Sequence, residues 1–161
     1  MADLVVTITE SVTLNGTARG SSNALTISGV DDIYHRIITC PDDTPVTVAT
    51  FHATTGASDS SLDVENVKYI RVTNLDASNP VIIDLQIDTA EDDSAAADQG
   101  ALLLEAGKSF IMGSPSDGIV VNSAGATPIT ALSSLVNLES IIVDPLSEAV
   151  KVEVFIASVV A

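Results

Sequence analysis

Two histidines and one cysteine are the residues of this chain whose chemistry could serve nucleophilic catalysis. A histidine base must reach both a nucleophile and a group that orients its imidazole. His35 alternates with Ile33 and Ile37, and His52 ends an apolar run, so both occupy positions typical of strands. Cys40 precedes a proline at the end of another apolar run, where a small buried side chain is the expected role. With no nucleophile-elbow, paired-histidine or phosphate-loop motif, we predict no enzyme, no catalytic residue and no cofactor.

The acidic loop predicted over 89–100 is the candidate cation site. Its run of aspartate, glutamate and serine offers the oxygen ligands that calcium prefers. An EF-hand counted from Asp88 would need glycine at position 6 and glutamate at position 12, where this chain has Asp93 and Gln99. We therefore favour a hydrated acidic loop and assign no metal ligand, while a cation held between the loops of neighbouring subunits stays an alternative.

The charge balance restricts the partners. The chain has 22 Asp and Glu against 6 Lys and Arg, a formal charge of −16, which opposes nucleic-acid binding because affinity for phosphates comes largely from cations. Its longest apolar stretches of about four residues fall far short of the roughly 20 that a membrane helix needs. The opening Met1-Ala2-Asp3 has no basic stretch typical of a signal peptide, and the lone cysteine forms no internal disulfide. We expect folding in a cytosol, with neither nucleic acid nor membrane as partner.

The hydrophobic pattern has a period of two rather than 3.6, which is typical of half-buried strands. It is clearest in 81–88, 150–156 and 4–9, where β-branched residues dominate. Further strands are predicted over 12–15, 24–29, 32–40, 46–52, 67–74, 101–105, 108–112, 118–122 and 139–144. Asn15-Gly16 is the strongest hairpin signal, because a type I′ turn needs positive φ at both central residues. The pattern therefore predicts an all-β fold, a sandwich or a barrel, with little helix.

The chain length of 161 residues favours a single domain over 1–161. Within it, the strand-turn-strand unit at 67–88 looks like the unit at 139–157. Two interpretations are open: a duplicated hairpin that builds two halves of one sandwich, or a likeness that any two hairpins share. The second is favoured, because strand, turn and alternating strand is a common pattern in all-β proteins.

Four ordered segments resemble the small virion structural proteins of marine tailed bacteriophages. They are I-T-E-S-V-T-L-N-G at 8–16, V-K-Y-I-R-V-T-N-L-D at 67–76, L-E-A-G-K-S-F-I-M at 104–112 and V-K-V-E-V-F-I-A at 150–157. The resemblance implies an antiparallel β-sandwich of jelly-roll type and a capsid decoration, or cement, protein. Such a protein would bind the major capsid protein on the outer capsid surface of the virion, after synthesis in the host bacterial cytoplasm, and would stabilise the shell by bridging its subunits.

Two further expectations follow from that role. Decoration of a symmetric lattice favours a homo-oligomer, and we expect a homotrimer. Residues 1–10 are expected to form an extended N-terminal arm or an edge strand, with Leu4, Val5, Val6 and Ile8 as the candidate interface, although an ordinary sandwich strand is equally consistent with the pattern. Two alternative functions stay open: a tail, neck or receptor-facing fibre module, and a soluble carbohydrate-binding sandwich. The second is disfavoured because the chain has no Trp, two Tyr and three Phe, few of the rings that line sugar sites.

Overall fold

The computed structural model describes residues 1–52, 61–87, 98–120 and 135–159. In these ranges every regular element is a strand, and the predicted all-β class is confirmed. The strands are β1 (Ala2–Thr9), β2 (Thr13–Leu14), β3 (Thr17–Ala18), β4 (Ser22–Val30), β5 (Asp32–Cys40), β6 (Val46–His52), β7 (Leu62–Asp63), β8 (Val67–Asn74), β9 (Val81–Ile87), β10 (Asp98–Leu104), β11 (Ser109–Met112), β12 (Leu138–Asp144) and β13 (Val150–Ser158).

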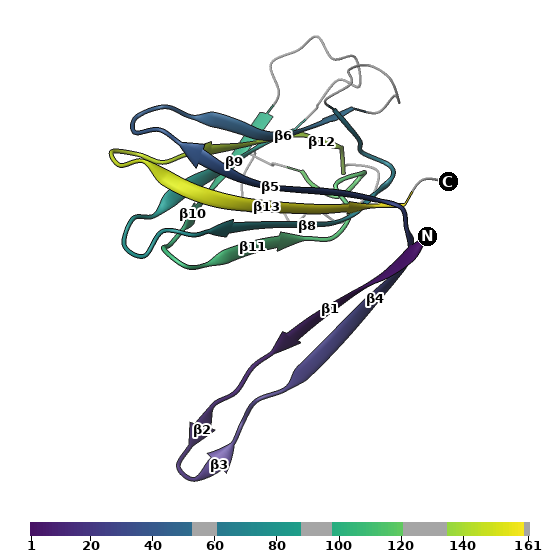
Figure 1. Cartoon of the computed structure of the whole chain (residues 1–161), viewed down its shortest axis with the longest axis vertical. Helices are drawn as coiled ribbons and strands as arrows, with labels where there is room; N and C mark the ends of the chain where they lie inside the picture. Colours follow the sequence, from purple (N-terminus) through teal and green to yellow (C-terminus); the bar gives the residue numbers. More distant parts are fainter. Residues whose placement is uncertain (53–60, 88–97, 121–134, 160–161) are drawn as a thin grey trace.

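The body of the molecule, which begins at β5, is a sandwich of two sheets (Figure 1). One sheet has the order β11-β8-β13-β5 and the other the order β10-β9-β12-β6-β7. The pairing is nested along the chain, since β5 pairs with β13, β6 with β12, β8 with β11 and β9 with β10. All of these pairs are antiparallel, and the nesting is the topology of a jelly roll. The short β7 adds a parallel edge to β6.

The core lies between the two sheets and is built by alternation along each strand. In β13 the inward Val150, Val152, Val154 and Ile156 are all buried, whereas Lys151 is exposed. Strand β9 shows the same alternation. The largest fully buried side chains are Phe51, Ile70, Ile83, Ile87, Leu138, Ile141 and Ile156. These branched and aromatic side chains pack well on pleated surfaces, which explains why the period-two segments of β9 and β13 lie in the interior of their sheets.

Residues 1–30 form a long hairpin, called the arm below, which projects from one end of the sandwich (Figure 1). Strand β1 pairs with β4, and β2 pairs with β3 at the far tip. Asn15 and Gly16 have φ angles of 50° and 77°, so the predicted two-residue turn with positive φ is confirmed. Residues 2–9 therefore lie in one strand of a two-stranded ribbon rather than in either sheet of the sandwich.

The base of the arm packs against the outer face of the four-stranded sheet. There Val30 is buried together with Tyr69 of β8 and Ala157 of β13, and Leu4 and Ile27 pack against them. Gly29 has a φ of 79°, next to the irregular register at the start of β1. Only glycine adopts that angle without strain, so it allows the ribbon to leave the direction of β5.

The units at 67–88 and 139–157 are not hairpins. Strand β8 lies in the four-stranded sheet and β9 in the five-stranded sheet, and the same is true of β13 and β12. Each turn is therefore a corner that carries the chain from one sheet to the other. The two units do lie side by side, since β8 pairs with β13 and β9 with β12.

Candidate interaction surface

The two faces of the arm differ in character. The register places Leu4 opposite Ile27 and Val6 opposite Leu25, followed by Ile8, so one face is apolar. The other face carries small and hydroxyl side chains around Val5, namely Thr7, Thr9, Ser22, Ala24 and Thr26. In the described part of the chain, neither outer edge of this ribbon pairs with another strand. The arm therefore presents an apolar face, a mixed face and two free strand edges.

The four candidate interface residues do not form one patch. Leu4 and Val6 lie on the apolar face, are half-buried and pack at the base of the arm. Ile8 is on the same face farther out and is 49% exposed, while Val5 is on the mixed face and is 58% exposed. The candidate interface therefore divides into a part that attaches the arm to its own sandwich and a part that is open to a partner.

An apolar groove runs between the arm and the sandwich. Val6, Ile8 and Leu25 line it from the arm, and Tyr69, Ile111 and Met112 line it from β8 and β11. Its volume is about 240 Å³, and no charged side chain lines it. Strand β11 is the edge of the four-stranded sheet, and its Ile111 is exposed, so the groove is open to a partner.

The tip of the arm, residues 11–21, is a second exposed apolar surface. Val12 is exposed and Leu14 is 59% exposed. Arg19 is the only charged residue of the tip. Together with Leu25 and Ile111, these apolar residues were missed by the sequence reasoning. Extension of the hairpin from Asn15-Gly16 in both directions would have found those on the arm, because the turn fixes which residues face each other.

His35 takes part in a polar network on the outer face of the four-stranded sheet. Its Nε2 lies 2.8 Å from Oε1 of Glu153, and Oε2 of Glu153 lies 2.8 Å from the Arg71 guanidinium. Arg71 also donates to the Thr73 hydroxyl at 2.7 Å. His35 of β5, Glu153 of β13 and Arg71 of β8 thus form one polar network across three neighbouring strands.

The network sets the ionisation of Glu153. The hydrogen bond with His35 is the largest effect and lowers the pKa of Glu153. Burial has a smaller effect in the opposite direction, and the hydrogen bond and charge of Arg71 lower the pKa further. Because the pKa is lowered in the folded chain, the stabilisation is present above the unfolded value of about 4.5 and is lost as the pH falls through the folded value.

Glu153→Gln is accordingly expected to lower the free energy of unfolding at pH 7 by about 1 kcal/mol or less, since the network is partly exposed and screened. The deficit should begin to shrink below about pH 4.5, where the carboxylate of the unfolded chain takes up a proton, and should vanish once the pH is below the lowered pKa of the folded chain. Urea unfolding between pH 3 and pH 7 measures it, with Glu148→Gln on an exposed turn as the control. A deficit that stays constant down to pH 3 would contradict this assignment.

The other candidate nucleophile and base lie apart from this network. Cys40 is fully buried in the core, and burial raises the pKa of its thiol, which keeps it protonated and unreactive. His52 is half-buried at the end of β6.

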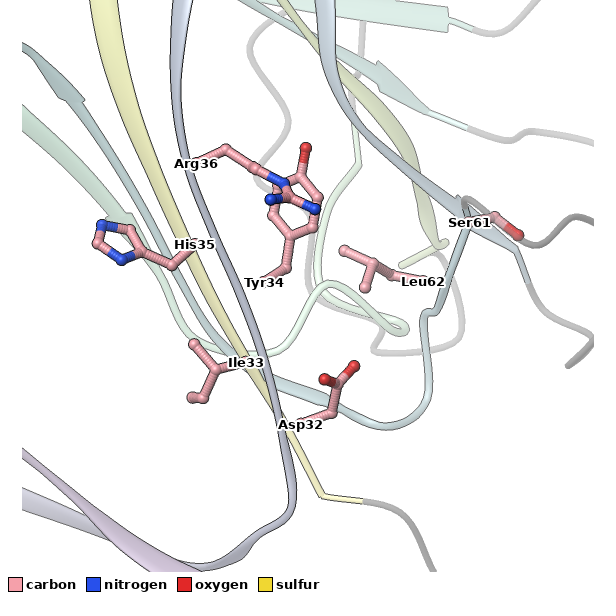
Figure 2. Close-up of a pocket in the computed structure, with 7 residues that line it drawn as sticks. All are labelled: Asp32, Ile33, Tyr34, His35, Arg36, Ser61 and Leu62. Carbon is pink, nitrogen blue, oxygen red and sulfur yellow. The ribbon is translucent and has the colours of Figure 1, made fainter.

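An open pocket of about 610 Å³ lies between β5 and the start of β7 (Figure 2). The Tyr34 hydroxyl donates to the carbonyl of Val48 at 3.1 Å and so links the edges of the two sheets, and the Arg36 guanidinium lies 5.7 Å from the centre of the Tyr34 ring. Figure 2 shows His35 on the opposite side of β5 from Ser61, so the pocket does not bring this histidine to that hydroxyl. Tyr34 and His35 are the two rings in the lining of this pocket.

Most of the acidic loop predicted over 89–100 lies outside the described ranges, Asp93 included, and the prediction was wrong for residues 98–100, which belong to β10. In the described residues, no group of three or more His, Cys, Asp and Glu side chains gathers in a way that could hold a metal ion. Those residues also contain no helix long and apolar enough to cross a membrane.

No protein family, curated protein or solved structure matches the chain.

Proposed function

We propose that this protein is a structural component of a virus particle. It is a capsid decoration protein that binds the outer surface of the shell and stabilises it. The arm is the observation that carries the proposal. It is a two-stranded ribbon that extends from the sandwich and exposes Val5, Ile8, Val12, Leu14 and Leu25. An isolated two-stranded ribbon is at best marginally stable in water, so such an arm favours a protein whose surfaces are completed by partners.

The charge distribution supports the same role for the arm. Asp3 and Glu10 against Arg19 leave residues 1–30 with a formal charge of −1, so −15 of the total of −16 lies on the remaining residues. Apolar, nearly neutral surface associates with little loss of charge hydration, whereas the acidic sandwich is repelled by like charge and stays hydrated. The arm is therefore the part best suited to attachment.

The jelly roll by itself allows several functions. It occurs in viral capsid proteins, in lectins and in cupins, so the fold alone decides nothing among them. What supports the contact role is the projecting arm with its exposed apolar residues.

Abundance in particles tests the proposal. A decoration protein is expected at a copy number similar to that of the major capsid protein, as measured by quantitative mass spectrometry on virus particles purified from the source of the gene. A few copies per particle would instead indicate a tail, neck or fibre module. Absence from the particles would contradict a virion role.

Val5→Asp is expected to weaken attachment to shells that lack the protein by about tenfold or more, because a charge replaces an exposed apolar contact on the mixed face of the arm. Co-sedimentation of the full-length variant with such shells measures the effect. Leu103→Asp is the matched control, because Leu103 is 56% exposed on the sandwich, close to the value for Val5. Equal binding by the two variants would show that the arm does not attach the protein.

A further inference from the structure

We infer that the tip of the arm of one copy binds in the apolar groove of a second copy. The inference rests on the proposed function in so far as it names the contact that links neighbouring copies. Its physical basis is a pair of unlike surfaces on one chain, the tip at residues 11–21 and the groove between the arm and β11. Both surfaces are apolar, so each can bury the other, and the tip lies too far from the sandwich to reach the groove of its own molecule.

The apolar side chains of the tip are not buried by the sandwich of the same molecule. Figure 1 shows β2 and β3 at the end of the arm farthest from the sandwich. Val12 and Leu14 are both more than half exposed there; Leu14 ends β2, a strand of only two residues, and Val12 directly precedes that strand. Since apolar side chains are driven out of water, the tip favours a partner that buries both of them.

The groove has a suitable size and an apolar lining for the side chains of the tip. Its volume of about 240 Å³ exceeds the roughly 150 Å³ of an apolar cavity that accepts benzene, so it has room for branched aliphatic side chains. Its lining is apolar apart from Asn23, and Ile111 is left partly exposed at the sheet edge. An incoming leucine would therefore displace water from apolar atoms without stripping water from a charge.

The charge distribution favours a second copy of the chain as the partner that inserts this leucine. Residues 11–21 contain Arg19 and no acid, so the tip has a formal charge of +1, and the rest of the chain carries −17. An acidic sandwich therefore attracts the tip of another copy. The ribbon from Ala2 to Leu14 is about 40 Å long at roughly 3.3 Å per residue, several times the Debye length of about 8 Å at physiological salt. Two acidic sandwiches joined through an arm thus stay far enough apart for their repulsion to be screened.

The contact is head-to-tail, because tip and groove are different surfaces. Such contacts close into rings when the rotation between copies allows it, and each copy then gives one tip and receives another. A ring of three copies would be the homotrimer expected above, and a ring of two would satisfy every tip as well. In either ring, closure adds the benefit of several contacts engaged together.

The test is complementation between two variants of the purified full-length protein. Leu14→Asp damages the tip, and Ile111→Asp damages the groove. Analytical ultracentrifugation at 0.15 M salt is expected to show wild-type oligomers and at least tenfold weaker association of each variant alone. An equal mixture should form a one-to-one pair, since the intact tip of the Ile111→Asp copy can enter the intact groove of the Leu14→Asp copy. Leu103→Asp, the matched control on the sandwich, should associate like wild type.

A further variant keeps the test independent of the stability of the sandwich. A Cβ at Gly20 would lie 1.9 Å from the carbonyl oxygen of Glu10, so Gly20→Ala must shift the backbone where the two parts of the ribbon meet. This site is on the arm, away from the sandwich core. We expect Gly20→Ala to weaken self-association while the thermal unfolding of the sandwich is unchanged, and Ile111→Ser replaces Ile111→Asp if the aspartate prevents folding.

Three outcomes would overturn the inference: a wild-type protein that is monomeric at every concentration, a mixture that fails to pair, or a loss of association with only one of the two variants. The experiment contains no virus particles, so its failure leaves the copy-number test of the proposed function untouched. Conversely, intact complementation by a protein that is absent from particles would remove the virion role and keep the tip-to-groove contact.

Discussion

Asn74→Leu is expected to lower the free energy of unfolding by about 2–4 kcal/mol, because it removes the three hydrogen bonds of a fully buried side chain. The Asn74 side chain is not exposed at all. Its Nδ2 donates to the carbonyls of Asn79, at 2.9 Å, and Leu104, at 3.2 Å, and its Oδ1 accepts from the backbone N–H of Asp76 at 2.9 Å. Leucine has a similar size but leaves all three backbone groups without this partner.

These bonds join parts of the fold that no strand ladder connects. Asn74 ends β8 in the four-stranded sheet, whereas Leu104 ends β10 in the five-stranded sheet. The bonds to Asp76 and Asn79 hold the corner that carries the chain across to β9. Only an amide of this length donates to two carbonyls and accepts from one N–H at the same time. Asn74→Asp is therefore expected to be at least as destabilising, since it brings a charge to a buried position beside two carbonyl oxygens.

Urea unfolding at pH 7 measures both variants. Asn66→Ala is the control, because the Asn66 side chain makes a single partly buried bond to Asp63 at 3.1 Å and its loss should cost about 1 kcal/mol. A midpoint for Asn74→Leu equal to that of wild type would show that the corner holds without the amide.

The bounds of several strands were predictable because burial leaves a direct trace in the sequence, whereas the strand predicted over 118–122 was wrong in its described part, which holds only an isolated bridge at Ile119. The predicted strands 32–40, 46–52 and 67–74 coincide with β5, β6 and β8. Each has one face against the core, and the alternation of apolar residues that this produces is clearest in β9 and β13. The pairing of those strands was not predictable in the same way, since β5 pairs with β13 at the other end of the chain. Strand, turn and strand also have the same local pattern in a hairpin and in a corner between sheets, which is why the 67–88 unit allowed the wrong interpretation.

The arm shows how far turn chemistry alone can reach. If Asn15-Gly16 occupies the turn, Leu14 faces Thr17 and every other pair has numbers that add to the same total of 31. The structure keeps that register from Leu14–Thr17 to Leu4–Ile27. The direction of the ribbon was not predictable, because it depends on the corner at Gly29 and on packing around Tyr69 and Ala157. The groove was not predictable for the same reason, because the residues of the arm and of β11 that line it come together only when the arm has this direction.

Ile156→Ala is expected to lower the free energy of unfolding by about 2–5 kcal/mol, the usual range for truncation of a fully buried isoleucine. Ile156 is not exposed and belongs to the main core cluster. It lies on β13, opposite Tyr34 of β5 and Ile70 of β8, in the middle of the four-stranded sheet. The cavity left behind is flanked by strands paired on both sides, so the surroundings can relax only in part, which places the loss toward the upper half of that range.

Ile37→Ala is the matched control for this prediction. Ile37 lies on β5 of the same sheet and is 63% exposed, so its truncation should change stability by no more than about 0.5 kcal/mol. Denaturant unfolding of both variants, followed by tyrosine fluorescence and far-UV circular dichroism, measures the difference between the inward and outward positions. The two isoleucines differ in the face of the sheet on which they lie, so equal losses would mean that the sheet is covered on its outer face, and a small loss at Ile156 would contradict the assigned core.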